Sequence, residues 1–140
     1  MKAERESWPD VQADLDVARL VFLDESSIVS GLTRNHGWSP IGSPAYIERQ
    51  VSPARVSVIG AVALDGMRGT MCIEGTVDGD VFLEYVQHIL VPTLNPGDVV
   101  VMDNLSVHKV DGVQALIAEA DATVLYLPRY SPDFNPIEML

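Results

Sequence analysis

Three carboxylates in this chain lie beside apolar runs, where acids are not expected. Asp24 ends the apolar run 19–24, and Asp103 follows the run 99–102 of three valines and a methionine. Glu138 stands near the last residue, after a proline-rich stretch. Carboxylate oxygens are the ligands that hard cations such as Mg²⁺ prefer. An acid at the point where a buried strand emerges is well placed to hold such an ion, so the three acids predict a metal site.

The elements that must position these acids indicate an α/β chain. Continuous apolar runs are typical of strands buried on both faces, and a spacing of three to four is typical of helices. Strands are predicted at 19–24, 28–29, 56–64, 69–77, 98–103 and 123–127, with a turn at Asp65-Gly66; helices are predicted from Asp78 or Asp80 to about 91, at 110–120 and from Asn135-Pro136. We therefore expect a mixed sheet with helices on its faces. The segment 31–53 is rich in Gly, Pro and Ser and is predicted to be a loop anchored by Trp38 and Tyr46.

The predicted sheet also gives a reason for the acids to converge. Ligands of open α/β sheets gather at the carboxyl ends of strands. If the strands of Asp24 and Asp103 are parallel neighbours, the two carboxylates come within reach of one metal ion. Two carboxylates that close cannot both ionise cheaply without a cation between them. For each acid alone, a turn or helix-capping role is the commoner alternative. The trio favours the metal site.

Three polar residues beside these acids are secondary candidates. Glu25 follows Asp24 and would point to the opposite face of a strand. Asn104 and His108 follow Asp103 and could lie near the same edge. A lone histidine is more often structural than catalytic, and we favour the structural role for His108.

Composition limits the class of protein. With 140 residues, 47% hydrophobic and 21% charged, the chain has the composition of one globular domain. No apolar run reaches membrane-spanning length, and the first residues lack the apolar core of a signal peptide. The single cysteine, Cys72, fits a reducing cytoplasm and lies in an apolar stretch typical of a core position. We predict a cytoplasmic protein.

The charge balance opposes simple nucleic-acid binding. The net charge is −11, whereas binding to phosphates relies on Lys and Arg. The segment 26–55 is the exception, since Glu48 is its only acid and its basic residues are Arg34, His36, Arg49 and Arg55. It is the best candidate for a phosphate-facing surface. A loop that happens to lack acids is an equal alternative.

Three blocks of sequence carry a family resemblance. The blocks 21–25, 101–108 and 126–138 together resemble the mariner-related bacterial insertion-sequence transposases, which belong to the DDE superfamily of metal-dependent endonucleases. The interval from Asp103 to Glu138 is 138 − 103 = 35 positions, which leaves the thirty-four intervening residues of that family's pattern. The last block is the most specific. Arg129 departs from it, because the family often has a second proline there.

The resemblance implies a fold and a division of the chain. Residues 19–140 would form a ribonuclease-H-like catalytic domain that is C-terminally incomplete, with its last helix truncated. Residues 1–18 would be a linker or N-terminal remnant. Only residues 137–140 remain to begin that helix, fewer than the dozen or so that an isolated helix needs. We therefore expect Glu138 to be weakly held.

The resemblance also implies an activity. Asp24, Asp103 and Glu138 would form the catalytic triad and bind Mg²⁺ or Mn²⁺, with two ions expected. A water, then a 3′-hydroxyl, would attack a phosphodiester in line during excision and strand transfer of a mobile element. The partners would be element-end and target DNA, reached through a separate DNA-binding domain, with a homodimer as one option. Two alternatives stay open: an inactive remnant that acts through protein contacts, and another ribonuclease-H-like nuclease.

Overall fold

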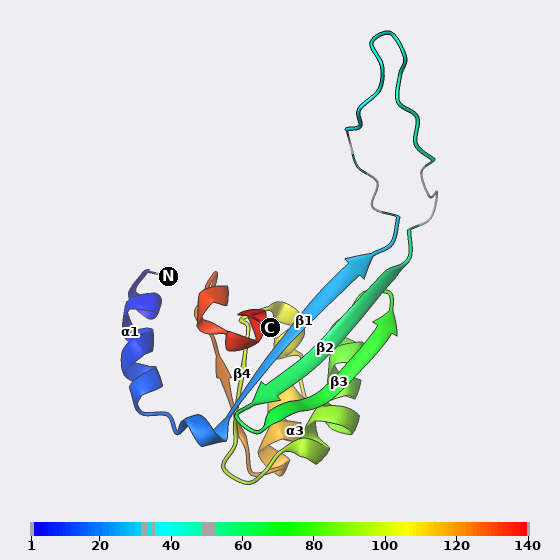
Figure 1. The fold of residues 1–140 in the computed structure, drawn as a ribbon. Coiled ribbons are helices and arrows are strands. Elements are labelled where there is room, and N and C mark those ends of the chain that lie inside the picture. Colours follow the sequence, from blue (N-terminus) through cyan, green and yellow to red (C-terminus); the bar gives the residue numbers. More distant parts are fainter. Residues whose placement is uncertain (1, 32–33, 35, 49–52, 140) are drawn as a thin grey trace.

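The computed structural model describes residues 2–31, 34, 36–48 and 53–139 (Figure 1). Its elements, in chain order, are α1 (Lys2–Ala13), the 3-10 helix η1 (Val17–Arg19), β1 (Leu20–Val29), β2 (Arg55–Ala63), β3 (Gly66–Glu74), α2 (Gly79–Tyr85), the π-helical turn η2 (Val86–Leu90), the 3-10 helix η3 (Val91–Thr93), β4 (Val99–Met102), the 3-10 helix η4 (Ser106–Lys109), α3 (Val113–Glu119), β5 (Thr123–Tyr126) and the 3-10 helices η5 (Pro132–Phe134) and η6 (Pro136–Met139).

Five strands form one mixed sheet in the order β3-β2-β1-β4-β5. β2 pairs antiparallel with β1 and β3, whereas β4 pairs parallel with β1 and β5. Gly66, the second residue of the predicted turn, begins β3 with a φ of +126°, a conformation that suits glycine. The parallel neighbours β4 and β5 are joined through α3, as a crossover connection requires. The predicted α/β class with a mixed sheet is confirmed.

One face of the sheet carries the main hydrophobic core. Val21 and Leu23 of β1 point to this face because side chains alternate along a strand. They pack with the fully buried Phe82 and Tyr85 of α2, while α3 covers the neighbouring strands. The Tyr85 hydroxyl donates a hydrogen bond of 2.6 Å to the carbonyl of Gly69, and burial raises the pKa of that hydroxyl. This bond ties α2 to β3.

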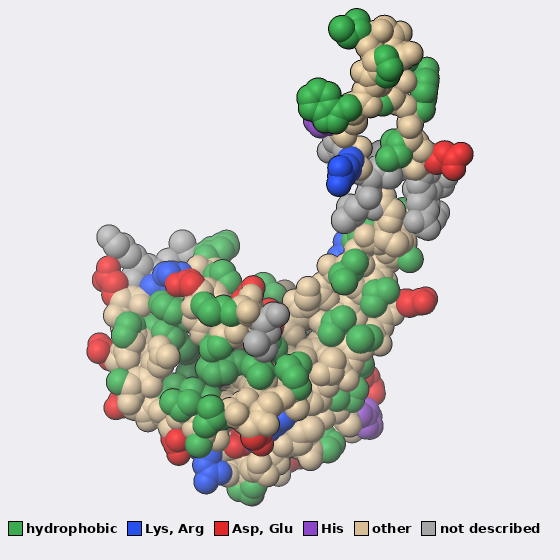
Figure 2. All heavy atoms as spheres, viewed as in Figure 1, with side chains coloured by type: hydrophobic (Ala, Val, Ile, Leu, Met, Phe, Trp, Pro, Cys, Tyr) green, Lys and Arg blue, Asp and Glu red, His purple; other side chains and the backbone are tan. Residues whose placement is uncertain are grey.

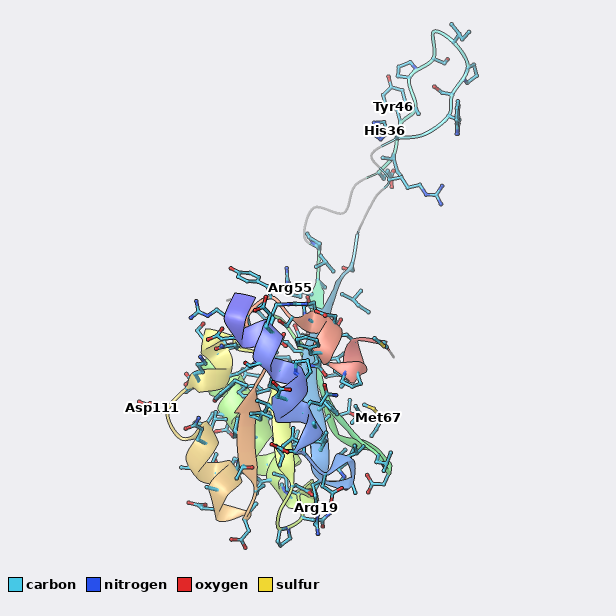
Figure 3. All side chains as sticks on the ribbon, turned by 90° about the vertical axis from the view of Figure 1, so that its left-hand side faces the viewer. Arg19, His36, Tyr46, Arg55, Met67 and Asp111 are labelled. Atoms are coloured by element: carbon cyan, nitrogen blue, oxygen red, sulfur yellow. The ribbon has the colours of Figure 1, made fainter. Side chains whose placement is uncertain are left out.

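The opposite face carries a smaller core around Trp8. Leu20 of β1, Val101 of β4 and Leu127 are buried with Trp8. In Figure 3, α1 and the helical turns near the C-terminus lie in front of this face. Helix α1 begins at Lys2 and ends at Ala13. The side chains that cover this face therefore come from both ends of the described chain.

Strand β1 is longer than predicted. The apolar run ends at Asp24, but the strand continues to Val29 and includes the separate short strand expected at 28–29. Its later residues stay paired with β2, for example Ser27 with Ser57. The last buried residue of β1 is Leu23, Asp24 and Glu25 are half-buried, and backbone hydrogen bonding continues beyond them. The end of the apolar run therefore marked the edge of the core and not the end of the strand.

The described residues of 30–54, here called the arm, connect β1 to β2 and project away from the body (Figures 1 and 3). Trp38 and Tyr46 do not anchor it, because their exposed fractions are 104% and 90%. Hydrophobic side chains are visible on the arm in Figure 2. For the described part of this segment the prediction of an irregular loop is confirmed, but not the anchoring role of its two aromatic residues.

The basic residues predicted to face phosphate are spread along this connection. Arg34 and His36 lie on the arm and are exposed. Arg55 lies at its base, where Nη1 donates to the Ser27 hydroxyl at 3.2 Å. Arg49 lies outside the described residues. Their role at a phosphate-facing surface stays a prediction.

Residues 79–93 wind as one helical stretch whose hydrogen bonding changes from α to π to 3-10. Asp78 accepts a hydrogen bond from the backbone N–H of Val81 at 2.9 Å, which confirms the predicted cap. Cys72, predicted to be a core residue, is exposed on β3. No helix within the described ranges is long and apolar enough to span a membrane.

Candidate metal centre

Asp24 and Asp103 come together because β1 and β4 run parallel in matched register. The register pairs Phe22 of β1 with Val101 of β4. Two residues further along each chain stand Asp24 and Asp103, which therefore lie side by side. Alternation of side chains turns both acids to the sheet face on which Trp8 is buried.

Glu138 reaches the two aspartates from η6. Asn135, just before η6, is fully buried, and its Nδ2 donates to the backbone carbonyl of Leu23 at 3.2 Å. Its Oδ1 accepts a hydrogen bond of 3.4 Å from the N–H of Ile137, and its carbonyl accepts one of 3.1 Å from the N–H of Glu138. One buried amide thus joins the Glu138 segment to β1, next to Asp24.

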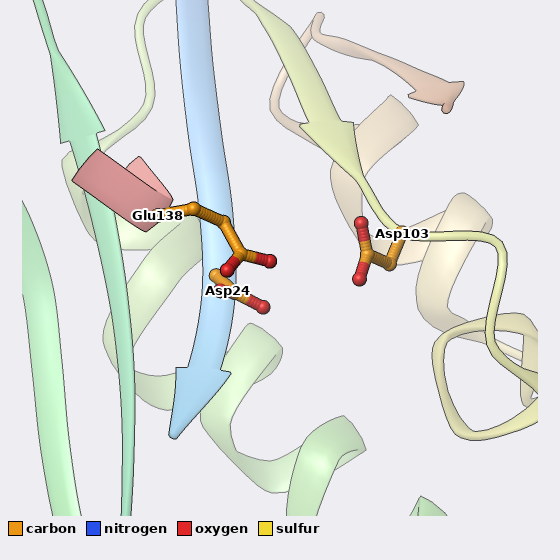
Figure 4. Close-up of side chains that lie close together, drawn as sticks. All are labelled: Asp24, Asp103 and Glu138. Carbon is orange, nitrogen blue, oxygen red and sulfur yellow. The ribbon is translucent and has the colours of Figure 1, made fainter. Parts of the chain in front are cut away.

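The three predicted acids form one cluster (Figure 4). Asp24, Asp103 and Glu138 each offer a carboxylate oxygen, and these oxygens lie within 4.8 Å of one another. The aspartates are partly buried and Glu138 is exposed. A cavity of about 500 Å³ opens onto the cluster and is also lined by Leu105 and Ile137. The acids are therefore close enough to share one cation and open enough to meet a substrate.

The cluster is electrostatically costly without a cation. Burial raises the pKa of Asp24 from 3.8 to about 6, although a backbone hydrogen bond at Glu25 opposes the rise. The negative charges of Glu138, Asp103 and Glu25 raise this pKa further. Two ionised carboxylates 4.8 Å apart repel by roughly 3 kcal/mol at an effective dielectric constant of about 20. A divalent cation between them removes this repulsion.

Glu25 and His108 lie behind the site, on the main-core side of the sheet. His108 is fully buried, 4.6 Å from the ring of Phe82 between centroids. Its Nδ1 lies 2.9 Å from the backbone carbonyl of Asp103, and a carbonyl only accepts, so Nδ1 donates. Its Nε2 lies 3.9 Å from Oε2 of Glu25. His108 therefore supports the backbone that carries Asp103, in agreement with the structural role favoured from sequence.

Asn104 lies beside the acids without joining them. It lines a second cavity of about 360 Å³, together with Asp103 and Arg129. The Asn104 Oδ1 is buried and has no hydrogen-bond partner among the described residues. Arg129 is exposed and places a positive charge next to a site that is otherwise acidic.

The residues that hold Glu138 are not identified by the sequence. The sequence predicts that a helix begins at Asn135-Pro136, and in the structure the Asn135 side chain also reaches β1. Glu138 is predicted to be weakly held, whereas its segment packs under α1, where Trp8 stacks on Phe134. The only signal was the presence of an aromatic residue, Trp8, in an otherwise polar N-terminal stretch. Its partner lies more than a hundred residues away and cannot be identified from spacing.

The family described as DDE superfamily endonuclease matches residues 19–140 of this chain. None of the curated proteins is a significant match. Among solved structures, the Mos1 mariner paired-end complex with Mg has a TM-score of 0.68 at 18% identity, covering 96% of this chain and 43% of that chain. The Mos1 strand transfer complex has a TM-score of 0.67 at 17% identity, with 96% and 42% covered.

The catalytic domain of the Mos1 mariner transposase is also similar, with a TM-score of 0.62 at 14% identity over 99% of this chain and 63% of that domain. The chain thus spans less than half of the longer Mos1 chains and less than two thirds of the isolated domain. At these identities the likeness concerns the fold. It confirms the predicted ribonuclease-H-like fold.

Proposed function

The chain belongs to the DDE superfamily of endonucleases, and from this we propose that it is the catalytic domain of a DNA transposase. The proposed activity is metal-dependent cleavage of phosphodiester bonds, followed by strand transfer during movement of a mobile element. The observation that carries the proposal is the convergence of three carboxylates, within 4.8 Å of one another, over an open cavity.

The donor set fits a divalent cation. Asp24, Asp103 and Glu138 would hold Mg²⁺ or Mn²⁺, because both are bound through carboxylate oxygens. We propose two ions, since the cluster is open on its Glu138 side. When bound, such ions polarise the scissile phosphate and lower the pKa of the attacking water or 3′-hydroxyl. The raised pKa of Asp24 supports a cation at this site. Burial and the neighbouring carboxylates raise this pKa, and no cationic side chain among the described residues offsets them.

The residues of the chain supply rigidity and orientation. The matched register of β1 and β4 fixes the spacing of Asp24 and Asp103. Asn135 holds the Glu138 segment against β1, and His108 holds the backbone of Asp103. A catalytic group must be kept within about 0.5 Å of its working position, so these buried contacts matter for the chemistry.

The substrate would be DNA, bound with help from elsewhere. A net charge of −11 repels phosphates overall. Arg129, at the rim of the cavity beside Asp103, is suited to contact one phosphate. Recognition of element ends would then require a separate DNA-binding domain, and a homodimer would pair two ends. We place the enzyme in the cytoplasm, in keeping with its single cysteine.

The test uses a supercoiled plasmid that carries the gene with its flanking DNA. We expect nicking or excision that requires Mg²⁺ or Mn²⁺, and we expect Asp103→Asn to reduce it more than about a hundredfold, because outer-shell changes alone cost 10–100-fold. Asp111→Asn, outside the cluster, is the matched control. Equal cleavage by Asp103→Asn and the parent would overturn the site. Normal Mn²⁺ binding without cleavage would favour the inactive remnant.

A further inference from the structure

Helix α1 precedes the residues matched by the family and contacts the segment that carries Glu138. Arg5 makes most of the polar contacts. Its Nη1 donates to the carbonyl of Tyr130 at 2.8 Å and to the hydroxyl of Ser131 at 2.9 Å. Its two terminal nitrogens also bind the carboxylate of Asp133, at 3.2 and 3.0 Å. One arginine thus engages three residues of the loop after β5.

Aromatic packing adds a second set of contacts. The rings of Trp8 and Phe134 are stacked, with centroids 6.1 Å apart and planes at 17°. The Arg5 guanidinium lies over the same Phe134 ring, 5.0 Å from its centroid. Trp8 is 6% exposed and Ser131 is 3% exposed, whereas the side chains of Arg5 and Asp133 are 38% and 55% exposed, so the buried part of the contact is the Trp8 and Ser131 part. Phe134 stands four residues before Glu138.

The segment held by α1 is poorly stabilised by its own backbone. Tyr130 has a φ of +57°, a left-handed conformation that a non-glycine residue rarely adopts. The segment then forms only two short 3-10 helices, η5 and η6. Helical pieces this short are not stable alone. The conformation around Glu138 must therefore come from tertiary contacts, and α1 and Asn135 provide them.

We propose that Arg5 and Trp8 are positioning residues, and that α1 is a clasp that holds residues 130–138 so that Glu138 reaches Asp24. An exposed Arg–Asp pair alone contributes little. Here the Arg5–Asp133 ion pair is bidentate, and Arg5 also donates to the buried Ser131 hydroxyl beside the stacked rings of Trp8 and Phe134. We therefore expect these contacts of α1 to stabilise the loop together. The effect on metal binding rests on the proposed function of Glu138, whereas the effect on loop order does not.

The first measurement is hydrogen exchange of the 140-residue chain with Arg5→Met, which keeps the length of the side chain. The reporters are the loop amides that donate hydrogen bonds, Phe134, Asn135 and Glu138. We expect them to exchange at least about tenfold faster, with β1 and β4 unchanged. Arg19→Met is the control. Arg19 also donates a side-chain hydrogen bond to a backbone carbonyl, but that carbonyl belongs to Pro96 and lies outside residues 130–138. Unchanged exchange at the loop amides in Arg5→Met would overturn the clasp.

The second measurement is Mn²⁺ affinity. If Arg5 only stabilised the fold, its effect on Mn²⁺ affinity would not depend on whether Glu138 is present. We expect Arg5→Met to weaken Mn²⁺ binding by about tenfold, the scale of a supporting contact around a metal. In a Glu138→Gln background the same change should have no further effect, because there is no ligand left to position. Additive losses would refute positioning of Glu138. Absence of Mn²⁺ binding in the parent would refute the proposed function, and exchange would still decide on the clasp.

Discussion

Replacing Asp24 by asparagine should stabilise this domain while removing its metal site. Burial raises the pKa of Asp24 from 3.8 to about 6, a shift of about two units. One unit corresponds to about 1.4 kcal/mol, so ionisation of Asp24 at neutral pH costs the folded state up to about 3 kcal/mol. The side chain is partly exposed, so we discount this to roughly 1–2 kcal/mol. Asp24→Asn removes the cost because an amide does not ionise.

The sign of the pH dependence follows from the direction of the shift. An acid whose pKa is raised on folding binds its proton more tightly in the native state. Its favourable contribution is complete below pH 3.8 and is lost as the pH rises through about 6. The parent should therefore lose stability across this window, relative to Asp24→Asn, when divalent ions are absent.

The assay is urea unfolding in EDTA at about pH 4.5 and about pH 8, with thermal unfolding alongside. We expect the advantage of Asp24→Asn to grow with pH and to reach about 1–2 kcal/mol, or about 3–7 °C for a domain of this size. Saturating Mg²⁺ should reverse the order, because it stabilises only the parent.

A matched variant, Asp65→Asn, has the opposite expectation. A hydrogen bond from Arg68 lowers the pKa of Asp65, so its loss should not stabilise the protein. If Asp24→Asn is no more stable than the parent at about pH 8 in EDTA, ionised Asp24 does not destabilise the folded protein. An equal gain in stability by Asp65→Asn would assign the effect to net charge alone and would also contradict a cost specific to Asp24.

Three further predictions concern buried polar contacts. Asp98 is 2% exposed and accepts a hydrogen bond of 2.9 Å from Arg68. Asp98→Asn should therefore lower the free energy of unfolding in urea by about 2–4 kcal/mol, and a loss below about 0.5 kcal/mol would contradict this. Asn135→Ala loses the bond to the Leu23 carbonyl and should cost about 1–3 kcal/mol and weaken Mn²⁺ binding in calorimetry; unchanged affinity would refute its positioning role. Tyr85→Phe loses one buried hydrogen bond and should lower thermal stability by about 1 kcal/mol without altering Mn²⁺ affinity.

Much of the fold could be predicted because its elements are marked locally. The buried runs that lead to Asp24 and Asp103 predict the neighbouring strands β1 and β4, and Asp78 marks the start of α2. The extent of β1 could not be predicted in this way. Ser26 and Ser27 are exposed yet still paired with β2, and an apolar pattern reports burial and not pairing.

The three acids of the candidate site could be predicted from the sequence, but the contacts that hold them in place could not. Nothing in spacing shows that β1 and β4 align so that Asp24 and Asp103 become neighbours, since this depends on register between distant strands. The contacts that hold Glu138 were invisible for the same reason. Arg5 and Asp133 are separated by 128 positions, and Asn135 bonds a backbone atom that any residue would offer.

We propose that Asp24, Asp103 and Glu138 together hold a divalent cation. The most direct measurement is anomalous diffraction from crystals of the chain soaked in MnCl₂. We expect a manganese peak in contact with carboxylate oxygens of all three residues, and we expect it to be lost in crystals of Asp103→Asn. Manganese bound elsewhere, or an equal peak in that variant, would contradict it.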